Sequence, residues 1–204
     1  MTDQELLITL LAERSSKRGH FILASGRESQ FYIDARLTTM SPDGLAVIGR
    51  LGLWTLQQSS WQVEAIGGLT LGADPISYAI SYASAGSARP LRAFTVRKEA
   101  KTHGTGKVIE GPFRPNDHVA VIEDVITTGS SALRAIDAVR NAGGTVSGVL
   151  AIVDRQEGGR EALESAGVPV IALTTASEIM AILEKRGDQR ESPSASTPGK
   201  PPRA

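Results

Sequence analysis

The chain has 204 residues, of which 41% are hydrophobic and 22% charged, as expected for one globular domain with a sizeable core. Lys and Arg together number 22, as do Asp and Glu, so no overall charge favours nucleic acid or an acidic membrane surface. The absence of cysteine excludes disulfides, thiolate metal sites and a cysteine nucleophile. No apolar run reaches membrane-spanning length, and the N-terminus lacks the basic start of a signal peptide, so we expect a cytoplasmic protein.

The first forty residues predict one helix followed by two strands. Four leucines recur at helical spacing between residues 6 and 11, so we expect an amphipathic helix that ends near Gly19. The stretch FILASGRESQFYIDARL, residues 21–37, then predicts two short strands around a Ser-Gly turn.

From about residue 42 the pattern alternates between helix and strand. Helices are predicted over residues 42–58, 74–86, 131–144, 158–167 and 176–185, and strands over residues 63–69, 90–97, 118–124, 145–154 and 168–175. In the second of these helices, Asp74 is placed to cap the N-terminus and Pro75 to occupy the first position. Strands with continuous apolar runs between helices are typical of an α/β fold with a parallel sheet covered on both faces. We expect a single domain over residues 1–186 and, because Pro and Ser dominate the rest, a disordered tail over residues 187–204.

Two acids and a polar turn follow one of the predicted strands, in the sequence VIEDVITTGSS at residues 121–131. Ligands of open α/β sheets bind at the carboxyl ends of strands. There Gly129, the neighbouring hydroxyls and the first amides of the next helix predict a cradle for a phosphate. Because Glu123 and Asp124 would repel that phosphate, they predict a ligand that also offers sugar hydroxyls or Mg²⁺. The alternative is a capped helix beside solvated acids.

Two further loops predict anion binding. The stretch FTVRKEAKTHGTGKVIEG, residues 94–111, gathers five cationic or titratable side chains around two glycines and follows a strand. Such a loop suits an anionic group, including one that gains negative charge during a reaction, and His103 could bind that group or donate a proton to it. The alternative is a solvated basic loop. The turn GGLTLGADP, residues 67–75, offers backbone amides in the same strand, turn and helix arrangement, although glycine-rich turns are common.

VIEDVITTGSS closely resembles the phosphoribosyl pyrophosphate (PRPP) motif of type I phosphoribosyltransferases, and RKEAKTHG, residues 97–104, resembles the mobile catalytic loop of orotate phosphoribosyltransferases. The resemblance spans roughly residues 20–175. It implies a central, mostly parallel sheet flanked by helices, with a small N-terminal hood formed mainly by about residues 1–40. It also implies a homodimer with shared active sites, in which the loop reaches into the neighbouring subunit.

The resemblance also implies roles for individual residues. The implied catalytic residues are Lys101, His103, Arg97 and Asp124. The implied PRPP contacts are Arg97, Lys98, Lys101, His103, Glu123, Asp124, Val125, Ile126, Thr127, Thr128, Gly129, Ser130 and Ser131. The implied pyrophosphate loop consists of Leu69, Thr70, Leu71 and Gly72. The implied orotate contacts are Thr127, Arg155, Ser25, Gly26 and Arg27. Three residues of the basic loop, Arg97, Lys101 and His103, would complete the active site of the partner subunit. Lys98 would lie nearer the active site of its own subunit.

Three points qualify these roles. Arg155 could instead be a surface residue paired with Asp154 or Glu157. Some family members have a lysine where this chain has Ala24 and another where it has Gly72, so we expect binding of PRPP and orotate to depend more on the mobile loop. Mg²⁺ is expected as cofactor, held mainly by PRPP with no firm direct protein ligand.

The expected reaction transfers the 5-phosphoribosyl group from PRPP to orotate, giving orotidine 5′-monophosphate and pyrophosphate in de novo pyrimidine biosynthesis. The expected partners are these two small molecules and a second copy of the chain, without nucleic acid or membrane. A purine phosphoribosyltransferase is one alternative, but that class shares the PRPP motif without the RKEAKTHG loop or the hood. A PRPP-sensing regulator is another, and it would usually need a basic face or a DNA-binding domain.

Overall fold

The computed structural model of the chain describes residues 1–22, 28–99 and 107–191. The described elements are, in chain order, α1 (Asp3–Leu10), a π-helical segment (Leu11–Ser15), β1 (Ser16–Ile22), β2 (Glu28–Ile33), α2 (Arg36–Thr39), α3 (Pro42–Gln58), β3 (Ala65–Leu69), α4 (Ala73–Ser84), β4 (Arg92–Val96), β5 (Ile109–Glu110), β6 (His118–Ile126), α5 (Ser130–Asn141), β7 (Thr145–Asp154), α6 (Gly159–Ser165), β8 (Val170–Thr175) and α7 (Ala176–Glu191). No helix within these ranges is long and apolar enough to cross a bilayer.

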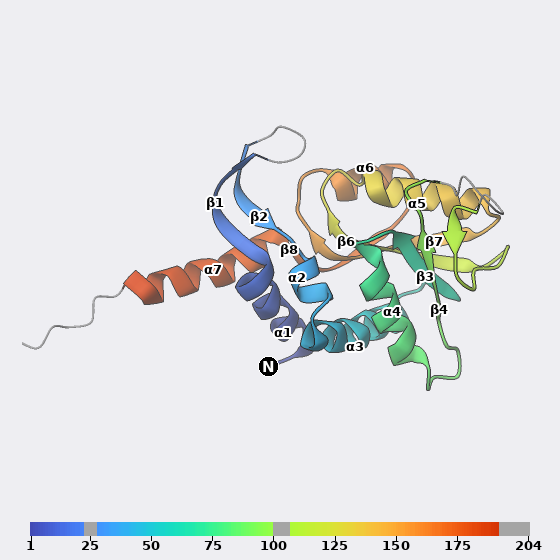
Figure 1. The fold of residues 1–204 in the computed structure, drawn as a ribbon, viewed down its shortest axis with the longest axis horizontal. Coiled ribbons are helices and arrows are strands. Elements are labelled where there is room, and N and C mark those ends of the chain that lie inside the picture. The colour runs from blue at the N-terminus through green and yellow to red at the C-terminus, as the bar shows by residue number, and fades with distance from the viewer. Residues whose placement is uncertain (23–27, 100–106, 192–204) are drawn as a thin grey trace, which may run out of the picture.

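A six-stranded sheet forms the centre of the molecule, with the strand order β5-β4-β3-β6-β7-β8 (Figure 1). All neighbouring strands are parallel except β4 and the two-residue edge strand β5, which pair antiparallel. The predicted α/β architecture with a mostly parallel sheet is therefore confirmed. Strand β5 was not predicted, because two residues are too few to show a periodic pattern.

Helices cover both faces of this sheet, so its strands are apolar on both sides. On one face, α1, α3, α4 and α7 pack over side chains such as Ile66, Ile122 and Leu150. On the other face, α5 and α6 pack over side chains such as Val121 and Val149. Successive side chains along a strand point to opposite faces of the sheet, so alternate residues of each strand pack on each face.

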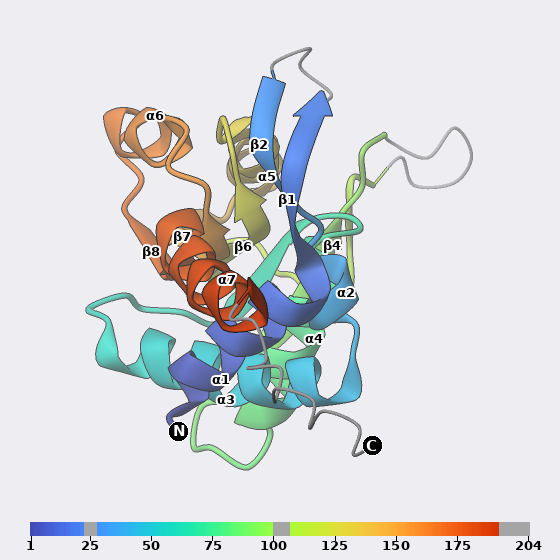
Figure 2. The same cartoon turned by 90° about the vertical axis from the view of Figure 1, so that its left-hand side faces the viewer.

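A separate hairpin of β1 and β2 rises beside the sheet (Figure 2), and we call this hairpin the hood. Its strands pair antiparallel, and the rings of Phe21 and Tyr32 lie 5.5 Å apart between their centroids. The two predicted strands are confirmed here. The Ser-Gly turn between them lies outside the described residues.

The largest differences from the predicted helix bounds are at the ends of the first and last helices. The first helix does not reach Gly19, because the helical region ends at Ser15 and β1 begins at Ser16. The buried hydroxyl of Ser15 lies 2.7 Å from that of Thr38, so a contact with a distant segment fixes this end. The last helix continues past Lys185 to Glu191, so the predicted disorder of residues 187–204 is wrong for residues 187–191. Residues 192–204 lie outside the described residues.

Asp74 is not the cap of α4, contrary to the prediction. The helix begins one residue earlier, and its N-cap is Gly72 without a side-chain hydrogen bond. The Asp74 carboxylate instead accepts hydrogen bonds from the hydroxyls of Thr70, at 2.6 Å, and Thr95, at 2.8 Å. Two hydroxyls from other elements thus determine where this side chain points.

Close packing at Gly68 brings β3 against both β6 and α4. A Cβ atom at this position would overlap the backbone carbonyl of Ile122 and would lie 2.7 Å from the Cβ of Ala73. The strand can therefore approach its neighbours only without a side chain here. This approach sets how near the turn after β3 lies to the end of β6.

We expect Gly68→Ala to lower the free energy of unfolding by about 2 kcal/mol or more, because the methyl group would push β3 away from β6. Urea unfolding followed by circular dichroism measures the change. Gly86→Ala is the matched control, since a Cβ atom there would meet nothing within 4 Å, and we expect a change of about 1 kcal/mol or less. Equal effects of the two substitutions would contradict the assigned packing.

Candidate active site

A cavity of about 320 Å³ lies where the carboxyl ends of β3 and β6 meet. The chain leaves β3 toward β4 on one side and leaves β6 toward β7 on the other, so this is the point where the strand order reverses. Open α/β sheets bind their ligands at such a point. The residues that line the cavity are Tyr32, Ile33, Asp34, Ala35, Arg36, Leu69, Thr70, Leu71, Gly72, Lys98, Glu123, Asp124, Val125, Thr127, Ser131 and Arg155.

The predicted phosphate turn lies between β6 and α5 at this cavity. Gly129 has a φ angle of 79°, which favours glycine, and it is the N-cap residue of α5. The backbone amides at the start of α5 are available to an anion, and Thr127 and Ser131 line the cavity. The hydroxyls of Thr128 and Ser130 are 3.3 Å apart on the exposed side of the turn.

One residue of the predicted PRPP motif is placed differently. The side chain of Ile126 is 1% exposed and packs in the apolar core beneath α5. Its carbonyl accepts a hydrogen bond from the amide of Arg155 at 2.9 Å. The side chain of Ile126 therefore packs away from the cavity, and the contact of this residue with PRPP stays a prediction.

Two carboxylates face the cavity with unequal surroundings. The Asp124 carboxylate accepts a hydrogen bond from the amide of Val125 at 2.9 Å. The shielded Oε2 atom of Glu123 has no hydrogen-bond partner among the described residues. Burial, and then the neighbouring charge of Asp124, raise the pKa of Glu123 well above its ordinary value. A ligand hydroxyl could satisfy this oxygen.

The turn after β3 forms the opposite wall. Thr70, Leu71 and Gly72 line the cavity, and the peptide bond between Thr70 and Leu71 is cis. The hydrogen bonds from Thr70 and Thr95 to Asp74 connect this turn to α4 and β4. The predicted pyrophosphate turn and the predicted PRPP motif therefore share one cavity.

Arg155 also reaches this cavity, from the end of β7. Its side chain is 7% exposed, and its guanidinium lies 2.8 Å from the Glu157 carboxylate. Asp154 pairs with Arg160 at 2.9 Å. Arg155 thus has the predicted pairing with Glu157, but its side chain is buried at the cavity, so the alternative of a surface residue is wrong.

The end of β2 and the start of α2 supply lining residues that the sequence analysis missed. Tyr32, Asp34 and Arg36 belong to this group, and the Arg36 guanidinium forms two hydrogen bonds with Asp34, at 2.8 and 3.0 Å. The stretch YIDAR had only been assigned to a strand. Its polar residues directly after an apolar strand were the available signal.

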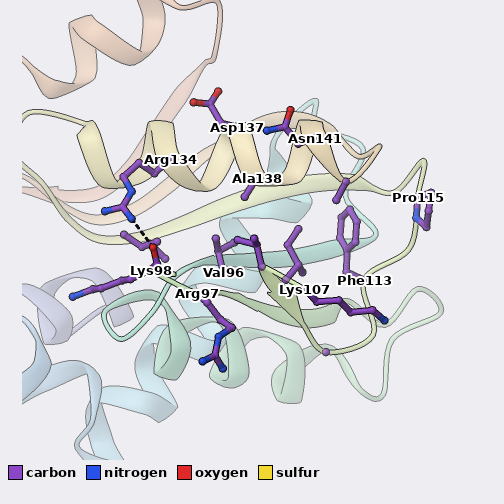
Figure 3. Close-up of a pocket in the computed structure, with 15 residues that line it drawn as sticks. Val96, Arg97, Lys98, Lys107, Phe113, Pro115, Arg134, Asp137, Ala138 and Asn141 are labelled. Carbon is purple, nitrogen blue, oxygen red and sulfur yellow. Dashed lines mark hydrogen bonds between the residues drawn. The ribbon is translucent and has the colours of Figure 1, made fainter. Parts of the chain in front are cut away.

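Arg97 and Lys98, which are described at the start of the basic loop, take different positions. Lys98 lines the cavity with the PRPP motif, whereas Arg97 lies outside it, 3.7 Å from the Glu110 carboxylate. A second cavity, of about 640 Å³, separates this loop from α5 (Figure 3). Across it Arg134 donates a hydrogen bond of 2.9 Å to the Lys98 carbonyl, which fixes the base of the loop (Figure 3).

Five predicted site residues lie outside the described residues. They are Ser25, Gly26, Arg27, Lys101 and His103. Their roles remain predictions from the resemblance.

Known proteins resemble this chain in sequence and in fold. The chain is 47% identical to the orotate phosphoribosyltransferase of Synechocystis over 184 residues, which cover 90% of the chain and 91% of that protein. It is 45% identical to the orotate phosphoribosyltransferase of Aquifex aeolicus, over 88% of the chain and 99% of the relative. The chain belongs to the orotate phosphoribosyltransferase family. No family model matches the chain.

Solved structures agree with this assignment. The orotate phosphoribosyltransferase of Mycobacterium tuberculosis, in complex with Fe(III) dicitrate, superimposes with a TM-score of 0.76 at 40% identity, covering 87% of this chain and 99% of that one. The same enzyme in complex with PRPP gives a TM-score of 0.73 at 37% identity, covering 88% and 99% of the two chains. The resemblance stated from VIEDVITTGSS and RKEAKTHG is confirmed, as is the type I phosphoribosyltransferase fold.

We expect Glu123→Gln to raise the free energy of unfolding at neutral pH by about 1 kcal/mol, because it removes a carboxyl group whose ionisation the folded state opposes. The raised pKa keeps Glu123 protonated in the folded state above pH 4.5, where the unfolded chain has lost that proton. The parent therefore loses stability relative to the variant as pH rises from 4.5, and the two converge below it.

Urea unfolding of both proteins at a series of pH values measures this difference. The exposed Glu161→Gln variant shows the background effect of removing one carboxylate. A stability difference between Glu123→Gln and parent that does not change with pH would contradict the assigned burial.

Proposed function

We propose that the chain transfers the 5-phosphoribosyl group from PRPP to orotate, giving orotidine 5′-monophosphate and pyrophosphate in pyrimidine biosynthesis in the cytoplasm. The main support is that the phosphate turn, the paired carboxylates and the turn after β3 line one cavity in a chain of this family. We also propose that residues 1–186 act as one catalytic domain and that the segment after α7 is a tail.

The two ends of PRPP suit the two walls of the cavity. The 5-phosphate would accept hydrogen bonds from the amides and hydroxyls of residues 127–131, at the N-terminus of α5. The ribose hydroxyls would donate to Glu123 and Asp124, which satisfies the shielded Oε2 atom. The pyrophosphate would then lie against the turn formed by residues 69–72.

Orotate carries a carboxylate that needs a cationic or amide partner. Arg155 lies at the cavity within reach of such a group, and Thr127 lines the same space. The backbone carbonyl of Phe31 accepts a hydrogen bond from Arg155 at 3.4 Å, which links this side chain to the hood. Ser25, Gly26 and Arg27 of the hood turn are proposed to cover the base.

Mg²⁺ is the proposed cofactor, and the donors present suit it in part. Glu123 and Asp124 are hard oxygen donors, but no group of three or more His, Asp or Glu side chains within the described ranges could hold a metal alone. PRPP would therefore supply most of its ligands. When bound, Mg²⁺ neutralises charge on the leaving pyrophosphate.

Charge stabilisation and positioning explain the reaction with little acid–base chemistry. Orotate can react as an N1 anion, so the main barrier is departure of pyrophosphate from an oxocarbenium-like ribose. Lys98 would stabilise the leaving group in its own subunit. Arg97, Lys101 and His103 are proposed to do so in the partner's site, which agrees with the position of Arg97 outside this subunit's cavity.

An exposed apolar face supports the proposed homodimer. Leu37 of α2, Met40 directly after α2 and Leu71 of the turn border one hollow of about 470 Å³, with exposed fractions of 55%, 44% and 54%. Tyr78 and Tyr82 of α4 are also exposed. A face of this kind beside an active site suits an isologous contact between two copies.

The purified protein should consume orotate, and no other base, when PRPP and Mg²⁺ are present. Parallel assays by ultraviolet absorbance with orotate, uracil, adenine and hypoxanthine measure this, and release of pyrophosphate confirms the reaction. Turnover of a purine would contradict the assignment of Arg155 to orotate. Binding of PRPP without turnover of any base would favour a PRPP-sensing regulator.

Shared active sites predict that two inactive variants restore each other. Lys101→Ala removes the loop cation and Asp124→Asn alters the ribose site, so each homodimer should lose most of its turnover. After unfolding and refolding together, mixed dimers contain one intact site, and about one quarter of parental activity should return. Lys107→Ala, a cation at the other end of the loop, is the control for charge loss. Failure of the mixture to regain activity would contradict the shared site.

A further inference from the structure

The turn that faces the pyrophosphate carries no cation at its last position, Gly72, and this residue lies directly against Asp124. A Cβ atom on Gly72 would lie 2.6 Å from the Cγ and both carboxylate oxygens of Asp124, so a side chain here would require the Asp124 carboxylate to shift. In this chain a cation for the pyrophosphate therefore comes from another element.

Arg36 is placed to supply that charge. It lines the same cavity as Thr70, Leu71 and Gly72, at the N-terminus of α2. It also borders the neighbouring hollow together with Leu71, so it lies at the rim between the two spaces. Its side chain is 49% exposed, which leaves the guanidinium accessible to an entering anion.

Asp34 orients the side chain of Arg36 and leaves it partly exposed. The two hydrogen bonds of 2.8 and 3.0 Å orient the planar guanidinium, and this group still has donors that face away from Asp34. Asp34 chiefly, and Asp124 more weakly, raise the pKa of Arg36. Of the other lining cations, Arg155 pairs with Glu157, and Lys98 would act on the same leaving group from the start of the basic loop.

We propose that Arg36 binds the pyrophosphate moiety of PRPP and thereby supplies a positive charge that Gly72 does not. The inference rests on the proposed function, because it assigns a residue to the pyrophosphate end of the same site. It adds a cation outside the mobile loop to the expectation that PRPP binding depends more on that loop.

Arg36→Ala should weaken binding of magnesium pyrophosphate about tenfold to a hundredfold, as expected for loss of charged hydrogen bonds. Isothermal titration calorimetry with inorganic pyrophosphate and Mg²⁺ measures this without any turnover. In steady-state kinetics the KM for PRPP should rise by a similar factor, while the KM for orotate stays within about twofold. Arg36→Lys should give an intermediate loss, because it keeps the charge without the planar fork.

Two controls separate this role from structural effects. Arg50→Ala breaks a comparable ion pair, with hydrogen bonds of 2.9 and 2.6 Å to Asp3, away from the cavity, and should leave pyrophosphate binding unchanged. The double variant Asp34→Ala with Arg36→Ala tests whether weaker pyrophosphate binding comes from repulsion by an unpaired Asp34 carboxylate. It should bind pyrophosphate as weakly as Arg36→Ala, or nearly so.

Parental affinity in Arg36→Ala or in the double variant would overturn the inference, as would a rise confined to the KM for orotate. A parent protein that binds no pyrophosphate would overturn it as well. A parent that binds pyrophosphate but does not convert orotate would instead contradict the proposed function, and the calorimetric comparison would still decide the role of Arg36.

Discussion

The site depends on the close approach of two parallel strands, β3 and β6, at their carboxyl ends. Gly68 permits the strands to meet, and Gly72 then lies against the carboxylate of Asp124. A turn that offers amides to an anion is thus held against two acids. These opposite preferences are compatible only with a ligand that is anionic at its ends and offers hydroxyls, or a bound cation, between them.

The charges around the cavity follow from this arrangement. Three acidic and three basic side chains line it, so it has no large net charge to attract PRPP. Two of the three cations, Arg36 and Arg155, already have carboxylate partners. The small net charge of the lining favours recognition by geometry over long-range steering.

Local patterns predicted the fold well, and distant contacts explain the errors. The bounds of α3, Pro42–Gln58, were predicted correctly because its cap and periodicity lie within the helix. Asp74 was misplaced because hydroxyls from β4 and the preceding turn attract it. The PRPP motif is continuous in sequence and was recognisable, whereas Arg36 enters the site only because the hood strand ends beside it.

Glu123 destabilises the empty cavity, and the same residue is suited to bind the ligand. Glu123 has a shielded oxygen without a hydrogen-bond donor among the described residues, and burial beside Asp124 opposes its ionisation. A ribose hydroxyl would supply the missing donor and favour the carboxylate form. Ligand binding and ionisation are then coupled, so PRPP should stabilise the folded chain most at a pH where the empty site is destabilised by its own charge. Ligand binding would thus restore the stability that the folded chain loses at Glu123, as is usual for a preorganised binding site.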